Sequence, residues 1–135
     1  MFTFTQKVLF RHCDPAGIVF YPKYYEMLND VVEEFFDCEL NYPFREVVVN
    51  NGVPAAQINA TFFAPSRLGD CLYLDLKITK LGSTSLNLTI DAHCEGERRF
   101  SAALVLVYVN NIGKSTSWPD SIRQTLQNQM HGDKQ

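Results

Sequence analysis

The chain has 135 residues, a length that suits one compact domain, and its 12 basic and 15 acidic side chains leave a net charge of −3. Its composition, 46% hydrophobic and 20% charged, is that of a globular protein and excludes a disordered chain. The mild acidic balance argues against a general nucleic-acid binder, because such proteins usually carry a basic excess. We therefore expect a single domain over residues 1–135 with one hydrophobic core.

Other classes of protein are excluded by motifs that the sequence lacks. No apolar run approaches the ~18 residues that span a bilayer, and the N-terminal segment does not resemble an export signal. We therefore expect a cytoplasmic protein with no membrane partner. The four cysteines form no C-x-x-C pair and the three histidines show no metal-ligand spacing, so we expect reduced thiols and no metal site. A phosphate-binding glycine-rich loop and a G-x-S-x-G elbow are also missing.

The first half of the chain predicts a strand, a turn and one long helix. Alternating apolar and polar residues over 2–11 indicate a half-buried strand. Asp14-Pro15-Ala16-Gly17 has the proline and glycine of a turn, and Pro22 can open a helix at its first position. Apolar residues then recur at steps of three and four, which predicts an amphipathic helix of roughly four turns that lies across a sheet. They are Tyr24, Met27, Leu28, Val31, Val32, Phe35 and Phe36.

The second half predicts four strands. Three segments alternate between apolar and polar residues, and the last is apolar on both faces, which is typical of a strand inside a sheet. The segments are 58–64, 72–79, 86–93 and 100–109. Short glycine-bearing links at 81–83 and 95–97 make the strands that they join antiparallel neighbours.

The end of the chain predicts a short helix from Asp120 through Ile122 and Leu126, followed by a polar tail from about Gln127. The order of elements is then one strand, one long helix and four further strands. This order predicts an α+β fold in which an antiparallel five-stranded sheet curls around one long central helix.

The strongest candidate for chemistry is the segment that joins the first strand to the helix. Its carboxylate, Asp14, stands shortly before a helix start, where backbone N–H groups lack internal partners and lie at the positive end of the helix dipole. A carbonyl oxygen directed there is polarised, and a nearby carboxylate can attack the carbonyl carbon or activate a water. The segment therefore suits acyl transfer to water. Asp-Pro-x-Gly is also an ordinary turn, and spacing alone favours that interpretation.

The stretch from Asp14 to Pro22, which reads Asp-Pro-Ala-Gly-Ile-Val-Phe-Tyr-Pro, resembles the 4-hydroxybenzoyl-CoA thioesterase family of hotdog-fold enzymes. The segment 52–54, the turn at 65–70 and the hairpin at 81–85 are similar to that family too. The resemblance runs from about Phe4 to Tyr108 and agrees with the order of elements. It implies a single hotdog thioesterase domain that hydrolyses an acyl-CoA or aryl-CoA thioester. No cofactor is implied, since coenzyme A is part of the substrate.

The resemblance also implies roles for individual residues. Asp14 matches the catalytic aspartate, and both a nucleophile and a general base stay open as its role. Tyr21 matches the residue whose backbone N–H receives the thioester oxygen, and Gly17 matches the glycine that lets the loop approach the substrate. Gly52, Val53 and Pro54 would come from a second subunit, because active sites of this fold form at a dimer interface. Ser85 would lie along the pantetheine arm.

Other positions depart from the family pattern or leave it open. His12 stands where many relatives carry a second acid, and it could tune Asp14 beside the substrate or simply cap the loop. The hairpin at 82–84 lacks the basic cluster with which some relatives hold the CoA phosphates, so isolated cations could substitute. Those cations are Arg67, Lys80, Arg98 and Arg99. The width of the acyl pocket, and with it the acyl group, depends on the packing of Phe20, Tyr24, Tyr25 and Phe62.

Three alternatives remain at this point. Another hotdog arrangement places the carboxylate on the long helix, where Glu26 or Asp30 would act, although helix patterning favours solvated positions for both. The chain could instead be a non-catalytic module that binds acyl-CoA or another small ligand, since a fold does not determine a function. A hotdog dehydratase is a third option, but its usual pairing of a histidine with an acid is not evident. A substrate groove half-made in one chain predicts a homodimer, and relatives often build a homotetramer.

Overall fold

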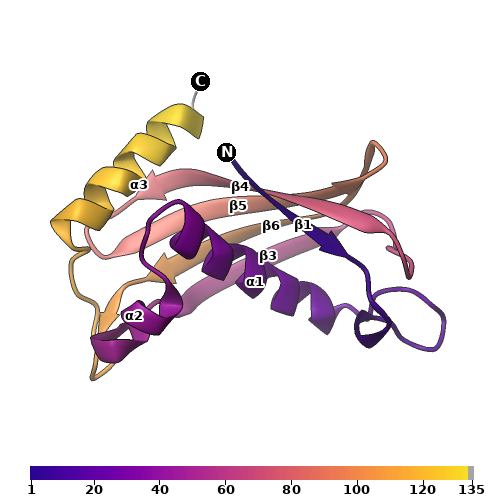
Figure 1. Cartoon of the computed structure of the whole chain (residues 1–135), viewed down its shortest axis with the longest axis horizontal. Coiled ribbons are helices and arrows are strands. Elements are labelled where there is room, and N and C mark those ends of the chain that lie inside the picture. Colours follow the sequence, from indigo (N-terminus) through magenta and orange to yellow (C-terminus); the bar gives the residue numbers. More distant parts are fainter. Residues whose placement is uncertain (134–135) are drawn as a thin grey trace.

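The computed structural model describes residues 1–133 and contains one five-stranded antiparallel sheet with a long helix against it (Figure 1). The strands of this sheet are β1 (Phe2–Lys7), β3 (Ala55–Phe62), β4 (Cys71–Leu81), β5 (Ser85–Cys94) and β6 (Glu97–Val107). They lie in the order β1-β4-β5-β6-β3. Tight turns join β4 to β5 and β5 to β6, which confirms the hairpins predicted from the glycine-bearing links.

The central helix α1 (Pro22–Cys38) lies across one face of the sheet (Figure 1). Its seven buried residues are the seven that the apolar periodicity predicts. They share one hydrophobic core with alternate residues of the three inner strands β4, β5 and β6, and the opposite faces of β4 and β5 carry mainly polar side chains. The strand residues of this core are Leu72, Leu74, Leu76, Ile78, Leu86, Leu88, Ile90, Ala92, Cys94, Phe100, Ala102, Leu104 and Leu106. The predicted α+β arrangement is therefore confirmed.

The first strand is shorter than predicted. β1 ends at Lys7, and the chain then forms a 3-10 turn, η1 (Phe10–His12), in which Phe10 is 83% exposed instead of belonging to an apolar strand face. The cause is local, because the backbone N–H of Leu9 donates to Nδ1 of His12 at 2.9 Å. That bond closes the turn and ends the extended run.

The strand predicted at 58–64 also differs from expectation. β3 ends at Phe62, and Ile58 and Phe62 are 39% and 44% exposed, although the alternation predicts one buried face. The reason is topological, since β3 is hydrogen-bonded to β6 on one side and forms an edge of the sheet on the other.

Three elements at one end of the molecule are absent from the sequence prediction. These are helix α2 (Phe44–Asn50) and the short strands β2 (Asn51–Gly52) and β7 (Val109–Asn110), which pair as a two-stranded ribbon. Each is too short to show a recognisable period of hydrophobic residues. They lie at the left of Figure 1, far from the loop that joins β1 to α1 at the right.

The C-terminal helix α3 (Asp120–Asp133) is longer than predicted and passes through the segment expected to be a polar tail; residues 134–135 of that tail lie outside the described residues. Its last residue explains the length. Asp133 accepts a hydrogen bond of 2.8 Å from the backbone N–H of Ile78, where β4 runs on beyond its pairing with β1. The helix thus covers an otherwise open strand edge. Among residues 1–133, no helix combines the length and the apolarity needed to cross a membrane.

Candidate active site

The loop between η1 and α1 holds Asp14 in a tight, internally bonded turn. Oδ1 of Asp14 accepts a hydrogen bond from the backbone N–H of Ala16 at 2.9 Å, and its carbonyl oxygen accepts one from Gly17 at 2.9 Å. Gly17 has a φ of +79°, a conformation that favours glycine. The N–H of Asp14 donates in turn to the carbonyl of Ile18 at 2.9 Å. The carboxylate is therefore oriented by the loop itself and remains partly accessible.

The start of α1 presents one free backbone donor. The N–H groups of Phe20, Lys23 and Tyr24 have acceptors in the carbonyls of His12, Phe20 and Tyr21, and Pro22 has no N–H. Within residues 1–133, the N–H of Tyr21 has no acceptor. Such a donor at the positive end of a helix dipole is suited to bind an oxygen that gains negative charge.

His12 lies behind this loop. It is 2% exposed, and its Nδ1 accepts the Leu9 hydrogen bond that closes η1. Burial lowers the pKa of the imidazole, and the charge of Arg11 acts in the same direction. The sequence leaves open whether His12 tunes Asp14 or caps the loop, and this geometry supports capping. Cys13 contacts the carbonyl of Leu9 through its thiol at 3.6 Å, which fits a structural role.

An apolar cavity of about 500 Å³ opens beside the free donor. It is lined by Val19, Tyr21, Tyr24, Phe62, Phe63, Ala64 and Pro65. Val19 is paired with Cys13, the residue that precedes Asp14, so the cavity wall and the Asp14 loop are parts of one hydrogen-bonded unit. The lining residues after Phe62 were not expected from the sequence, although Pro65, which ends the strand pattern, marks the position where the chain turns.

Tyr24 forms the aromatic floor of the cavity. Its ring stacks on Phe62 with centroids 5.5 Å apart and packs on Phe100 at 4.5 Å. The side chain is 5% exposed, and this burial raises the pKa of its hydroxyl. Of the aromatic residues expected to set the pocket width, Tyr24 and Phe62 line this cavity. Tyr25 instead borders a smaller one of about 80 Å³ beside Val53.

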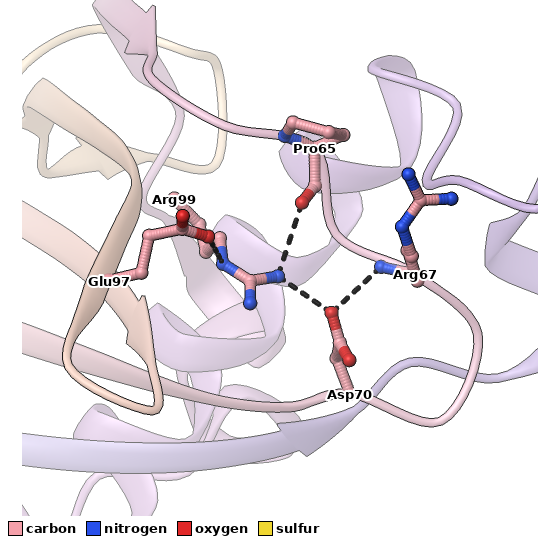
Figure 2. A network of polar contacts seen from close by, with 5 residues as sticks. All are labelled: Pro65, Arg67, Asp70, Glu97 and Arg99. Atoms are coloured by element: carbon pink, nitrogen blue, oxygen red, sulfur yellow. Dashed lines mark hydrogen bonds and ion pairs between the residues drawn. The ribbon is translucent and has the colours of Figure 1, made fainter.

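The predicted phosphate-binding cations have different environments. Arg99 is 7% exposed and is held by Asp70 at 2.6 Å and Glu97 at 2.8 Å, so it is committed to a buried network (Figure 2). Arg98 is exposed and lies over the ring of Phe63 at 4.3 Å, at the cavity wall. Arg67 and Lys80 are exposed as well. Of these four cations, Arg98 contacts a lining residue, Phe63, and Arg67 follows the lining residue Pro65 by two positions.

The remaining predicted site residues lie far from Asp14 within one chain. The segment Gly52-Val53-Pro54 follows α2 at the end of the molecule opposite to the Asp14 loop (Figure 1). Ser85 begins β5 near the start of α3, and its carbonyl oxygen accepts a hydrogen bond from the Trp118 indole at 3.2 Å. A single copy therefore does not bring these residues to the candidate site.

The alternative carboxylates on α1, Glu26 and Asp30, do not line the aromatic cavity. Glu26 forms an ion pair with Lys23 at 2.9 Å, and its side chain is 61% exposed. Hydrogen bonding to Lys23 lowers the pKa of this exposed carboxyl. Asp30 borders a separate hollow with Phe4, Glu33 and Glu34. The part of the chain described by the structure has no group of three His, Cys, Asp or Glu side chains placed to hold a metal ion.

Comparison with known protein families finds a match to the thioesterase superfamily over residues 16–101. Two curated proteins are similar in sequence. A 4-hydroxybenzoyl-CoA thioesterase from Pseudomonas sp. (strain CBS-3) is 35% identical over 77 residues, which are 54% of each chain. A 1,4-dihydroxy-2-naphthoyl-CoA hydrolase from Synechocystis sp. (strain ATCC 27184 / PCC 6803 / Kazusa) is 29% identical over 80 residues, 58% of each chain. The chain thus spans little more than half the length of the curated relatives that it matches.

Among solved structures, a gentisyl-coenzyme A thioesterase superposes with a TM-score of 0.85 at 27% identity, covering 92% of this chain and 98% of the other. Likeness over that length confirms the predicted hotdog fold, because it includes the sheet and the central helix together.

Proposed function

We propose that this chain, which belongs to the thioesterase superfamily, hydrolyses CoA thioesters and prefers an aromatic acyl group. The observation that carries the proposal is the loop before α1. It holds the partly accessible carboxylate of Asp14 and leads to the unpaired N–H of Tyr21, next to an aromatic cavity. A carboxylate and a free donor at a helix start, held by one loop, suit acyl transfer to water.

The first step is binding of the thioester carbonyl. Its oxygen accepts the hydrogen bond of the Tyr21 N–H, which is oriented before substrate arrives and therefore needs no reorganisation. The positive end of the α1 dipole adds to this field. Both effects grow as the oxygen becomes an oxyanion, so they stabilise the tetrahedral intermediate more than the bound substrate.

Asp14 supplies the second half of the reaction in either of two ways. As a general base, it takes a proton from a water whose oxygen attacks the carbonyl carbon. As a nucleophile, it attacks that carbon itself and forms a mixed anhydride, which water then cleaves. In both cases the carbon–sulfur bond breaks and the thiolate of coenzyme A leaves. The hydrogen bond from Ala16 holds Oδ1, and Oδ2 has no partner within residues 1–133, which favours Oδ2 as the reacting atom.

The preference for an aromatic acyl group follows from the cavity. Tyr24, Phe62 and Phe63 present aromatic surfaces, and an aryl ring gains from offset or edge contacts with them beyond simple burial. The names of both curated relatives also specify aryl-CoA substrates. We therefore propose a benzoyl-type or larger aryl thioester as the preferred substrate class.

We propose that the complete site needs a homodimer. β3 is an open edge whose residues are exposed almost throughout, as is expected of a strand that pairs with another copy. If β3 pairs antiparallel with β3 of a second copy, the first residues of the strand in one copy lie beside its last residues in the other. This pairing would carry the segment 52–54, just before β3, toward the cavity at Phe62 of the second copy. This geometry supports the role expected for Gly52, Val53 and Pro54.

The experiment is an assay of CoA release with a panel of thioesters, namely benzoyl-, 4-hydroxybenzoyl-, butyryl-, octanoyl- and palmitoyl-CoA, with free thiol as the readout. We expect the highest kcat/KM for the aryl thioesters. Tight binding of all five without release of thiol would identify a non-catalytic binding module. Sedimentation at micromolar concentration checks the homodimer, and a monomer there would contradict it.

A further inference from the structure

The guanidinium of Arg99 is built into a buried network that no step of the proposed reaction uses (Figure 2). Nη1 donates to Oδ2 of Asp70 at 2.6 Å and to the carbonyl oxygen of Pro65 at 3.2 Å, and Nε lies 2.8 Å from Oε1 of Glu97. The Arg99 side chain is 9% exposed, whereas that of Glu97 is 58% exposed. One buried cation on β6 is therefore tied to both ends of the segment 65–70, the clamp loop.

The clamp loop is also closed from within. The backbone N–H of Arg67 donates to Oδ2 of Asp70 at 2.9 Å, the oxygen that Arg99 binds. This bond and the guanidinium both lower the pKa of Asp70. Burial alone would lower the pKa of Arg99, but hydrogen bonding to Asp70 and its charge raise it. The pair is therefore ionised in the folded protein at neutral pH.

The other side of the clamp loop holds the Asp14 loop. The N–H of Val19 donates to the carbonyl of Ser66 at 2.9 Å, the N–H of Leu68 donates to the carbonyl of Gly17 at 3.3 Å, and Ile18 pairs with Arg67. Residues 17–19 lie within the segment that joins Asp14 to Tyr21. Their backbone is thus attached to the clamp loop by several contacts, and Ser66 is completely buried.

We propose that Arg99 is a positioning residue: through Asp70 and Pro65 it fixes the clamp loop, and the clamp loop fixes the relative placement of Asp14 and the Tyr21 N–H. This inference rests on the function proposed above, because it assigns Arg99 a part in that reaction. The residue touches neither substrate nor reacting atoms. Its effect is on orientation, where a small misplacement of a reacting group lowers the rate more than it weakens binding.

The test compares two carboxylates that hold the same guanidinium. Asp70→Asn weakens the bond between Arg99 and the clamp loop. Glu97→Gln is the matched control, because it weakens a bond of Arg99 to a residue that does not belong to the clamp loop. Arg99→Lys is a second variant, since a lysine keeps the charge but has no planar fork with which to hold Pro65, Asp70 and Glu97 together. Kinetics are measured on benzoyl-CoA well below the unfolding temperature of each variant. Backbone hydrogen exchange is followed at Val19 and Leu68.

We expect Asp70→Asn and Arg99→Lys to lower kcat by about 10- to 100-fold, a range typical of misplaced reacting groups, with little change in the Kd for free coenzyme A. Exchange at Val19 and Leu68 should become faster in both. Glu97→Gln should retain kcat and slow exchange. Unchanged kcat and protection in Asp70→Asn would overturn the proposal, as would equal losses in Glu97→Gln, which would indicate a general effect on stability. If the wild-type protein hydrolyses no CoA thioester, the proposed function fails, and hydrogen exchange alone decides whether Arg99 fixes this backbone.

Discussion

The backbone N–H of Val19 donates a 2.9 Å hydrogen bond to the carbonyl oxygen of Ser66, and Ser66 is completely buried. Val19 lines the aromatic cavity and lies between Asp14 and Tyr21 in the chain. A bond shielded from water is strong and directional, so it ties the candidate active site to a segment that is distant in sequence. The site is therefore a product of the tertiary fold as well as of its local motif.

The aromatic cavity predicts that Phe62→Leu lowers kcat/KM for benzoyl-CoA more than for butyryl-CoA. The Phe62 ring stacks on Tyr24 and is 44% exposed, so the substitution removes an aromatic surface without emptying the core. An aromatic pair contributes roughly 0.5–1.5 kcal/mol beyond buried area, which corresponds to a loss of about 2- to 12-fold. Steady-state kinetics on the two thioesters measures the difference.

Phe10→Leu is the control for this prediction, because Phe10 is 83% exposed and does not line the cavity. It should leave the ratio of the two kcat/KM values unchanged. An equal loss on both substrates in Phe62→Leu would show that the ring does not select aryl groups.

The buried His12 predicts a specific dependence of stability on pH. Its pKa is lower in the folded chain than in the unfolded chain, chiefly because of burial. The unfolded chain therefore binds more protons as the pH falls below about 6.5, and the free energy of unfolding decreases from there down to the folded pKa. Above that window the contribution is fully present. Denaturant unfolding at pH values from 8 to 5, in steps of about one unit, measures how the free energy of unfolding depends on pH.

His12→Asn supplies the comparison, since an asparagine oxygen can accept the Leu9 hydrogen bond but does not titrate. Its free energy of unfolding should fall less steeply in the same window, and the other two histidines are common to both proteins. Parallel pH curves for the two proteins would refute the assignment.

The end of α3 predicts a stabilising role for Asp133. Its carboxylate accepts the N–H of Ile78 on the part of β4 that β1 does not cover, and its side chain is 5% exposed. Asp133→Ala leaves this donor without a partner and should lower the free energy of unfolding by about 1–3 kcal/mol. Asp133→Asn keeps a side-chain oxygen that can accept this hydrogen bond, so its free energy of unfolding should fall by less. Urea denaturation of the three proteins provides the values, and a stability of Asp133→Ala equal to that of wild type would contradict this role.

Most of the fold can be predicted because hydrophobic periodicity records burial directly. The seven buried residues of α1 and the inward faces of β4 and β5 follow from steps of three and four and from alternation. The pattern fails where burial depends on the neighbours of an element. Ile58 and Phe62 alternate like a buried face, yet they are exposed because β3 lies at the sheet edge. Phe10 is exposed because a side-chain bond of His12 ends β1 early.

The candidate site, too, has residues that the sequence can identify and residues whose role depends on the tertiary fold. Asp14, Gly17 and Tyr21 are close in sequence, so a motif can identify them. Arg98 and Arg99 are adjacent cations that local sequence does not distinguish. One is exposed over Phe63 and the other is buried with Asp70, at a position where the register between β5 and β6 shifts and the regular alternation of the strand is interrupted. Contacts from distant segments thus determine which cation can meet a ligand and which supports the fold.

The proposed hydrolysis depends on the carboxylate of Asp14. Asp14→Asn keeps a side-chain oxygen that can accept the Ala16 hydrogen bond, so the turn should persist, with a change in unfolding free energy within about 0.5 kcal/mol. The variant loses the negative charge needed for either proposed role. Asp30→Asn, which removes a carboxylate from a hollow that shares no lining residue with the aromatic cavity, is the control and should hydrolyse benzoyl-CoA at the wild-type rate.

The most direct measurement is therefore kcat/KM for benzoyl-CoA in wild type and Asp14→Asn, with both proteins shown to be folded. We predict a loss of at least about 100-fold in the variant, the scale of a missing general base or nucleophile. Hydrolysis by Asp14→Asn at the wild-type rate would contradict the proposed role of Asp14.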